Sequence, residues 1–201
     1  MNLIVNETES IARIKVPFDD LYTSVFLVKL DDGILLVDCA TTAEDVDGYI
    51  APAICELGYT PKDVKAIVIT HRHSDHDGGL SRICELIPSI EVIRDVFTIS
   101  DRLEIYPLPG HTKHCIGLLD KESGTLISGD GLQGAGVSKY RCNVEDKAAY
   151  TDTLLRIRND KRIKKILFSH AYEPWYSDSV TGREEILLAL GECAKYIGEK
   201  L

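Results

Sequence analysis

A histidine-rich segment, His71–His76 (HRHSDH), constrains this chain more than any other feature. Three of the six histidines of the chain lie within it. The apolar, β-branched run 65–69 before it predicts a buried strand. The residues after it predict a helix that starts near Gly79 and stops before Pro88. Loops that connect a buried strand to a helix often carry functional residues, so the fold has to present this segment to a ligand.

The spacing within this segment is typical of metal ligands. His71 and His73 are two residues apart, and such side chains in an extended segment point to the same side. Asp75 and His76 follow, and the turn predicted at 77–79 directs them to a different position. Imidazoles and carboxylates without a thiolate suit zinc and also accept iron or manganese. A polar surface loop that happens to be rich in histidine is the alternative, and it would be preferred for an isolated H-x-H.

Size and composition limit the kinds of binding partner expected for this chain. The 201 residues fit one domain, 1–201, with a substantial apolar core. A net charge of -9 disfavours binding to a nucleic-acid backbone, so we expect a small-molecule substrate. No apolar run approaches the roughly 18 residues of a membrane span, and residues 1–9 do not resemble a secretory signal. Six scattered cysteines without a C-x-x-C pair then predict reduced thiols and a cytoplasmic protein.

The apolar patterns predict strands in meander-like groups followed by helices, twice over. Two apolar runs, 24–30 and 33–37, flank Asp31-Asp32, a hairpin signal. Between residues 90 and 128 the pattern predicts four or five short strands, and 165–168 predicts another buried strand. Besides the helix after Gly79, three helices are predicted: from Thr42 towards Leu57 with a kink at Pro52, from Asn143 to about Arg158, and behind a capping box of Thr181 with Glu184. This order favours two layers of sheet with helices outside them.

The histidine segment resembles the H-x-H-x-D-H signature of the metallo-β-lactamase superfamily. Four more segments match motifs of that family in the same order: Leu35–Asp38 (LLVD), Leu108–Thr112 (LPGHT), Ile127–Asp130 (ISGD) and Leu167–His170 (LFSH). The resemblance therefore extends from about residue 24 to residue 170. It implies an α/β (α+β) fold, a four-layer αββα sandwich of two mixed β-sheets flanked by helices.

The same resemblance implies two divalent metal ions, with zinc expected and iron or manganese compatible. One ion is assigned to three histidines: His71, His73 and His111. The other is assigned to Asp75, His76 and His170. Asp130 is implied to bridge the two ions, and Asp38 to support the metal loop from close by. Taken singly, His111, Asp130 and His170 would each be interpreted as ordinary turn or core residues.

A pair of such ions shares and activates a water, so the expected nucleophile is hydroxide, oriented by Asp75. The resemblance favours a dinuclear hydrolase of a small ester, thioester or lactone, because Asp130 stands where lactam-cleaving members commonly have cysteine. The alternatives are a mononuclear iron oxidoreductase similar to persulfide dioxygenases, a small-molecule phosphodiesterase, and a binding protein without activity. Oligomeric state is left open.

The chain departs from the family after Thr112. Lys113-His114-Cys115 replace the common Pro-Gly-Ser, so His114 matches no ligand position and is expected at the surface or beside the ligands. We expect Cys115 to be an inert packing residue, although a thiol so near a metal is the reactive alternative. Two tyrosines that follow metal segments, Tyr140 and Tyr172, are candidates for oxyanion stabilisation or ordinary packing. Specificity is expected in loops 18–23 and 133–142.

Overall fold

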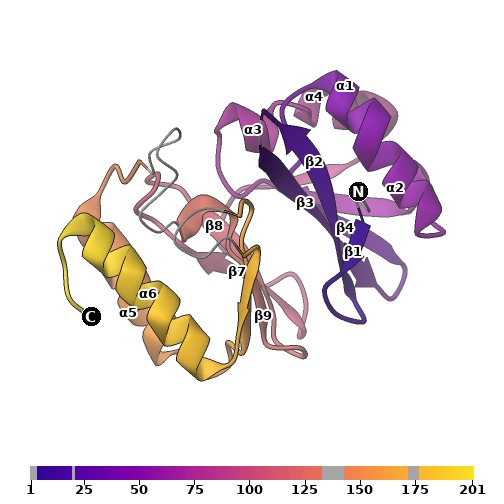
Figure 1. Ribbon diagram of the computed structural model, residues 1–201. Helices are drawn as coiled ribbons and strands as arrows, with labels where there is room; N and C mark the ends of the chain where they lie inside the picture. The colour runs from indigo at the N-terminus through magenta and orange to yellow at the C-terminus, as the bar shows by residue number, and fades with distance from the viewer. Residues whose placement is uncertain (1–3, 20, 133–142, 172–176) are drawn as a thin grey trace. The chain divides into compact units, whose positions relative to one another are not determined.

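The computed structural model describes residues 4–19, 21–132, 143–171 and 177–201, which belong to two compact units, Met1–Arg94 and Asp95–Leu201 (Figure 1). In the first unit, six strands form a mixed sheet whose order follows the sequence. The first four strands are antiparallel, and the fourth, fifth and sixth are parallel. The strands are β1 (Ile4–Asn6), β2 (Ile11–Phe18), β3 (Leu21–Leu30), β4 (Gly33–Val37), β5 (Val64–Val68) and β6 (Glu91–Ile93).

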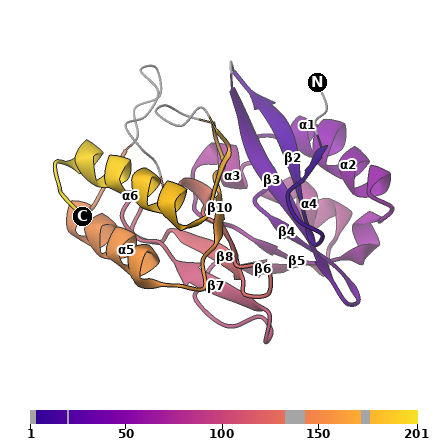
Figure 2. The same ribbon diagram turned by 60° about the horizontal axis from the view of Figure 1, so that its bottom comes forward.

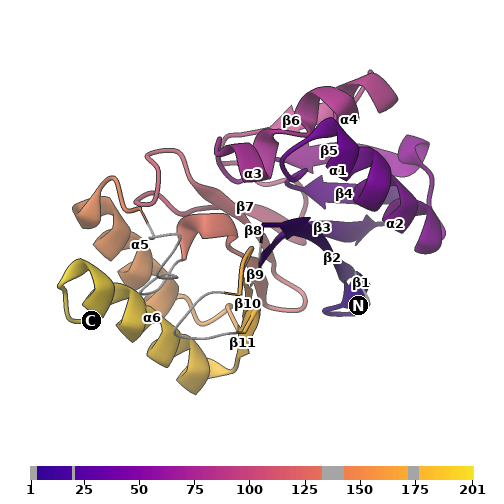
Figure 3. The same ribbon diagram turned by 45° about the horizontal axis from the view of Figure 1, so that its top comes forward.

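Short helical segments cover one face of this first sheet (Figure 3). They are α1 (Ala43–Asp45), the π-helical η1 (Val46–Ile50), α2 (Ala51–Glu56), the 3-10 helix η2 (Pro61–Asp63), α3 (Ser74–Asp77) and α4 (Leu80–Leu86). Alternate residues of β2, such as Ile14 and Val16, pack against Ile50, Ile54 and Ile83 in one core cluster. The strand period of two therefore directs one set of side chains to the helices.

The predicted hairpin and the first helix are confirmed. Leu30 pairs with Gly33, so Asp31-Asp32 form the turn between β3 and β4. Thr42 caps α1, where its side chain accepts a hydrogen bond from the backbone N–H of Asp45. Pro52 is the second residue of α2, which directly follows the π-helical turn η1. A proline lacks the N–H of the regular ladder, so the irregular turn falls where the kink was predicted.

The second unit contains a five-stranded sheet in the order β11-β10-β9-β8-β7, in which only β9 and β10 are parallel neighbours. Helices α5 (Lys147–Asn159) and α6 (Arg183–Ile197) lie side by side along it (Figure 2). Their apolar stripes, with Leu154 and Leu190, join Leu119, Leu126 and Ile166 of the strands in one core. The other elements are β7 (Leu103–Pro107), β8 (Ile116–Asp120), β9 (Thr125–Ile127), the 3-10 turn η3 (Gly129–Gly131), β10 (Lys165–Leu167) and β11 (Ser179–Thr181).

Two predicted helix starts in the second unit are wrong. Asp146, rather than Asn143, caps α5, because its side chain accepts from the N–H of Ala149. Gly182 precedes α6, and the carboxylate that accepts from the N–H of Thr181 belongs to Glu185 instead of Glu184. In both cases a residue with a similar side chain, one or three positions further along, makes the predicted kind of contact instead.

The predicted class is confirmed: two mixed sheets with helices. The layer order of the sandwich and the single domain over 1–201 stay predictions. Among the described helices, none is both long and apolar enough to cross a membrane.

Gly110 provides a test of the second core. Its φ is 140°, and a Cβ there would lie 2.5 Å from the Cβ of buried Tyr150. Gly110→Ala should therefore lower the free energy of unfolding by about 2–4 kcal/mol, through clash and backbone strain. Gly191→Ala is the matched control, because a Cβ on this exposed residue of α6 meets nothing within 4 Å. The control should raise stability by about 0.5–1 kcal/mol in urea unfolding followed by circular dichroism.

Candidate metal centre

Parallel strand pairs deliver the candidate ligands in both units, except His111, which follows the antiparallel strand β7. In the first unit Val37 of β4 pairs with Val68 of β5, and the N–H of Asp38 donates to the carbonyl of Val68 (2.8 Å). The chain after β4 and the chain after β5 therefore leave the sheet at the same edge. In the second unit β9 and β10 are parallel, and the segments that carry Asp130 and His170 leave their sheet in the same way. The carboxyl ends of parallel strands are the usual place for ligand sites in α/β sheets.

The first group of candidate ligands is His71, His73, Asp75 and His76. Nε2 of His71 lies 3.0 Å from Nδ1 of His73, so the two imidazoles converge. Asp75 and His76 lie on α3, which His73 precedes, and there Oδ2 of Asp75 is 3.4 Å from Nε2 of His76. The rings of His71 and His76 lie close together, with centroids 4.1 Å apart.

Asp38 organises this first group. Oδ1 accepts the N–H of Thr70 (2.8 Å), and Oδ2 is 2.8 Å from the hydroxyl of Thr70 and 2.7 Å from Nδ1 of His76. Because Asp38 and His76 are buried, water has little access to these contacts. A proton on Nδ1 of His76, donated to the carboxylate, leaves the electron pair of Nε2 directed towards Asp75.

The backbone around Asp38 is unusual. Asp38 and Ala40 have φ of 63° and 59°, a left-handed conformation that costs a non-glycine residue roughly 1–2 kcal/mol. Hydrogen bonds from Cys39 N–H to His76 O (2.9 Å) and from Gly79 N–H to Ala40 O (3.3 Å) hold this turn. The turn is therefore over-determined by its contacts with the metal loop.

Gly78 and Gly79 form the predicted turn, between α3 and α4. Their φ angles of -63° and -77° are ordinary helical values, so the turn itself does not require glycine. A Cβ on Gly78 would lie 2.0 Å from the carbonyl oxygen of Thr41, and one on Gly79 would lie 2.2 Å from that of Cys39. The two glycines allow the metal loop to pack directly against the backbone that follows β4.

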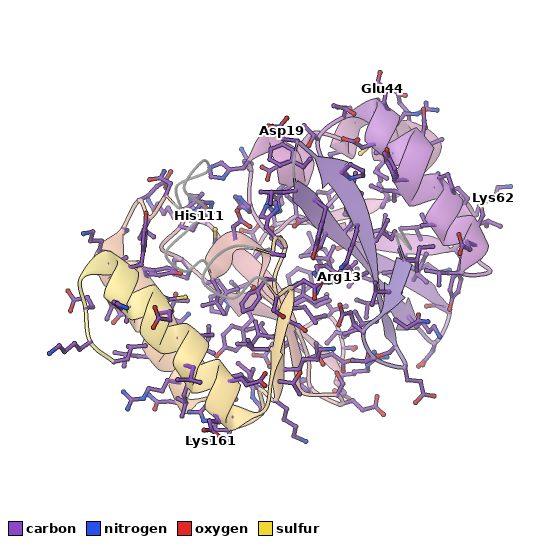
Figure 4. The ribbon with its side chains drawn as sticks, viewed as in Figure 1. Arg13, Asp19, Glu44, Lys62, His111 and Lys161 are labelled. Carbon is purple, nitrogen blue, oxygen red and sulfur yellow. The ribbon has the colours of Figure 1, made fainter. Side chains whose placement is uncertain are left out.

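The second group of candidate ligands is His111, Asp130 and His170, all buried. Oδ1 of Asp130 lies 3.4 Å from Nε2 of His170, and Oδ2 lies 3.8 Å from Nε2 of His111. Each oxygen of this carboxylate thus faces a different imidazole. Nδ1 of His111, labelled in Figure 4, is paired with the backbone carbonyl of Asn143, which leaves Nε2 as the electron-pair donor.

The turn that carries His111 is closed by Cys115. Its sulfur accepts the N–H of Thr112 (3.4 Å) and lies 3.1 Å from the hydroxyl of Thr112. Cys115 is buried and acts as a packing and turn residue, as expected, while His114 next to it is exposed. Tyr140, Tyr172 and loop 133–142 lie outside the described residues.

The donor atoms of both groups fit a divalent metal. Two ligands of one tetrahedral zinc ion, at 2.0–2.1 Å each, are separated by about 3.3 Å. The four pairs within the units are separated by 3.0–3.8 Å. Facing lone pairs at such distances repel unless a cation or a proton lies between them. Nitrogen and oxygen donors of this kind suit zinc, iron or manganese.

Cys39 lies beside this set without joining it as a thiolate. Burial, together with the charges of Asp38 and Asp77, raises the pKa of Cys39 far above its ordinary value. Its thiol donates to the carbonyl of His76 (3.3 Å). Sequence reasoning predicted neither the position of Thr70 at the site, nor the contact of the Asn143 carbonyl with His111, nor the contact of Cys39 with His76. Only the position of Thr70, directly before His71 at the end of a strand, was a usable signal.

Comparison with known proteins shows similarity at the level of sequence. A family model described as the metallo-beta-lactamase superfamily matches residues 18–98. A hydroxyacylglutathione hydrolase of Vibrio cholerae is 26% identical over 195 residues, covering 84% of this chain and 73% of that protein.

Solved structures share the fold. A metallo-beta-lactamase from Erythrobacter litoralis superposes with a TM-score of 0.72 at 21% identity, covering 97% of this chain and 98% of that one. The metallo-beta-lactamase FIM-1 from Pseudomonas aeruginosa, in its mono-zinc form, also gives 0.72, at 17% identity over 96% of this chain and 94% of that one. The family model, the relatives and the shared fold together support a metallo-beta-lactamase superfamily hydrolase.

The raised pKa of Cys39 has a measurable consequence. Since a raised pKa keeps a thiol protonated, Cys39 should resist iodoacetamide at pH 8, whereas exposed Cys55 should be alkylated. Peptide mass spectrometry of the native protein measures both residues, and labelling in urea shows that both peptides are detectable. Equal labelling of Cys39 and Cys55 in the native protein would contradict the assignment of Cys39 as a protonated core thiol.

Proposed function

We propose that the two groups of ligands form one dinuclear metal centre that hydrolyses a small ester, thioester or lactone. The single observation that carries this proposal is the close pairing of donor atoms within each group. Asp130 contributes most to it, because its two oxygens face His111 and His170 separately, as a bridging carboxylate would require. Zinc is the proposed metal, and FIM-1, which shares the fold, is described with one zinc ion.

In the proposed assignment each ion takes ligands from both groups. One ion would be held by three imidazoles, His71, His73 and His111. The other would be held by Asp75, His76 and His170, and Asp130 would be shared. When bound, such ions lower the pKa of a water molecule towards ~7 and polarise a carbonyl group.

The protein's own residues then orient the reactants and handle the proton. Asp75 is the more exposed of the two proposed carboxylate ligands. Its side chain is 15% accessible, and the side chain of Asp130 is 8% accessible. Asp75 is therefore the proposed group that orients the attacking water and accepts its proton. Asp38 has its oxygens occupied by Thr70 and His76, so it holds the loop and does not contact substrate.

The substrate class rests on the relatives and on the donor set. Several relatives at 25–26% identity are named as hydrolases of hydroxyacylglutathione, an acyl group carried on glutathione. A carbonyl attacked by activated water needs no serine or cysteine nucleophile, and Cys39 and Cys115 are buried and engaged in hydrogen bonds. An activated acyl substrate, in a thioester or a lactone, therefore fits best.

A ligand variant tests the proposed centre. His71→Ala should remove at least one ion per chain and lower kcat/KM by more than about 100-fold, because even outer partners of ligands cost 10–100-fold. His114→Ala is the matched control, an exposed histidine that the proposal leaves without a role. Elemental analysis by mass spectrometry measures the metal. Full metal content and full turnover in His71→Ala would refute the assignment.

Metal identity and substrate are tested together. Protein purified without added metal should contain zinc and should hydrolyse members of a panel of thioesters, lactones, β-lactams and phosphodiesters, with acyl substrates preferred. One equivalent of iron with oxygen uptake on a persulfide would instead support the mononuclear oxidoreductase. Turnover of the phosphodiester alone would support the phosphodiesterase.

A further inference from the structure

Thr70 occupies a defined position between Asp38 and His71. Its hydroxyl oxygen lies 2.8 Å from Oδ2 of Asp38 and 3.2 Å from Nδ1 of His71. Its N–H donates to Oδ1 of the same carboxylate (2.8 Å), so both ends of the threonine are anchored. The residue is 1% exposed, which leaves water little access to this short chain of contacts.

The direction of each hydrogen bond follows from the donor inventory. An ionised carboxylate only accepts, so the hydroxyl proton of Thr70 is donated to Asp38. The oxygen of Thr70 then has a lone pair available for His71, and Nδ1 of His71 carries the proton that is donated to it. Nε2 of His71 then keeps its electron pair. This atom lies 3.0 Å from Nδ1 of His73.

The same carboxylate acts on the second imidazole without an intermediary. Oδ2 of Asp38 accepts from Nδ1 of His76 at 2.7 Å. One buried carboxylate therefore sets the proton position of two histidines, directly for His76 and through the hydroxyl of Thr70 for His71. In the proposed function these two histidines belong to different ions.

We propose that Thr70 is a positioning residue that controls the ion held by His71 separately from the ion held by His76. This inference rests on the proposed dinuclear centre. The Thr70 hydroxyl holds the plane and the tautomer of His71, so its loss weakens one ion and leaves the other. Outer partners of metal-bound histidines typically contribute 10–100-fold to metal affinity.

Two variants separate the hydroxyl from the shape of the side chain. Thr70→Val keeps the volume and removes the hydroxyl, whereas Thr70→Ser keeps the hydroxyl and removes a methyl group. Zinc titrated against a competing chelator into the metal-free full chain should show one of two affinities weakened 10–100-fold in Thr70→Val. The other affinity should stay within about 2-fold, and Thr70→Ser should restore both to near wild type.

Thr125→Val is the matched control. Thr125 is equally buried, at 1% exposure, and its hydroxyl accepts from Ser123 (2.9 Å) at the beginning of β9, in the unit without Thr70. The Thr125→Val variant makes the same side-chain change in a β-strand that contains no proposed ligand. Both zinc affinities of the control should match those of the wild type.

A second measurement needs neither metal nor turnover. Long-range ¹H–¹⁵N spectra of the metal-free protein distinguish a proton on Nδ1 from one on Nε2. His71 should carry its proton on Nδ1 in the wild type and in Thr70→Ser, and should lose this preference in Thr70→Val, while His76 should keep its own proton on Nδ1 in all three proteins.

The outcomes distinguish the two proposals. A wild-type chain that binds no metal would refute the proposed function, and the spectra of the metal-free protein would still test the Thr70 contact. Two ions bound equally well by wild type and Thr70→Val, with unchanged spectra, would overturn the role of Thr70 alone. Equal weakening of the binding of both ions in Thr70→Val would also overturn it, because the effect of Thr70 would then be general rather than selective.

Discussion

The Asp38 carboxylate is the interaction on which the candidate site depends. It accepts the N–H and hydroxyl of Thr70 and is paired with Nδ1 of His76, all at 2.7–2.8 Å and all buried. A buried carboxylate is costly unless its oxygens are paired, and here the partners are the metal loop itself. The contacts that stabilise this carboxylate are thus the same contacts that fix the geometry of the loop.

Close backbone packing makes that arrangement possible. Asp38 and Ala40 have left-handed φ angles, and the segment they belong to packs on Gly78 and Gly79 with no space for a Cβ. Both features bring the chain after β4 against the loop after β5. The left-handed backbone at Asp38 and Ala40 and the absence of a Cβ at Gly78 and Gly79 therefore act together to hold the histidines in place.

The two units use the same principle with different details. Each has parallel neighbours, β4–β5–β6 in the first sheet and β9–β10 in the second, beside antiparallel strands. Polar residues that follow those strands leave at a shared edge, which explains why Asp130 and His170 lie together although they are distant in sequence. The rest of each sheet and its helices form the apolar support, with Leu119 and Leu154 in one core and Ile14 and Val16 in the other.

Periodicity and turn chemistry were sufficient for most elements. The hairpin at Asp31-Asp32 and the cap at Thr42 are local features, since they depend on residues a few positions apart. The starts of α5 and α6 were misplaced because Asp146 and Glu185 compete locally with Asn143 and Glu184. Short edge strands such as β1 and β11 carried too few residues to show an alternation.

The sequence alone determined which residue types were available for metal chemistry, because H-x-H spacing and ordered motifs are properties of the chain. Tertiary structure decided which donor and acceptor atoms face one another. The contacts of Asp38 with Thr70 and His76 join residues more than thirty positions apart, and so does the exclusion of a Cβ at Gly78 and Gly79. Such contacts depend on strand pairing and on the packing of one backbone against another, which no local pattern encodes.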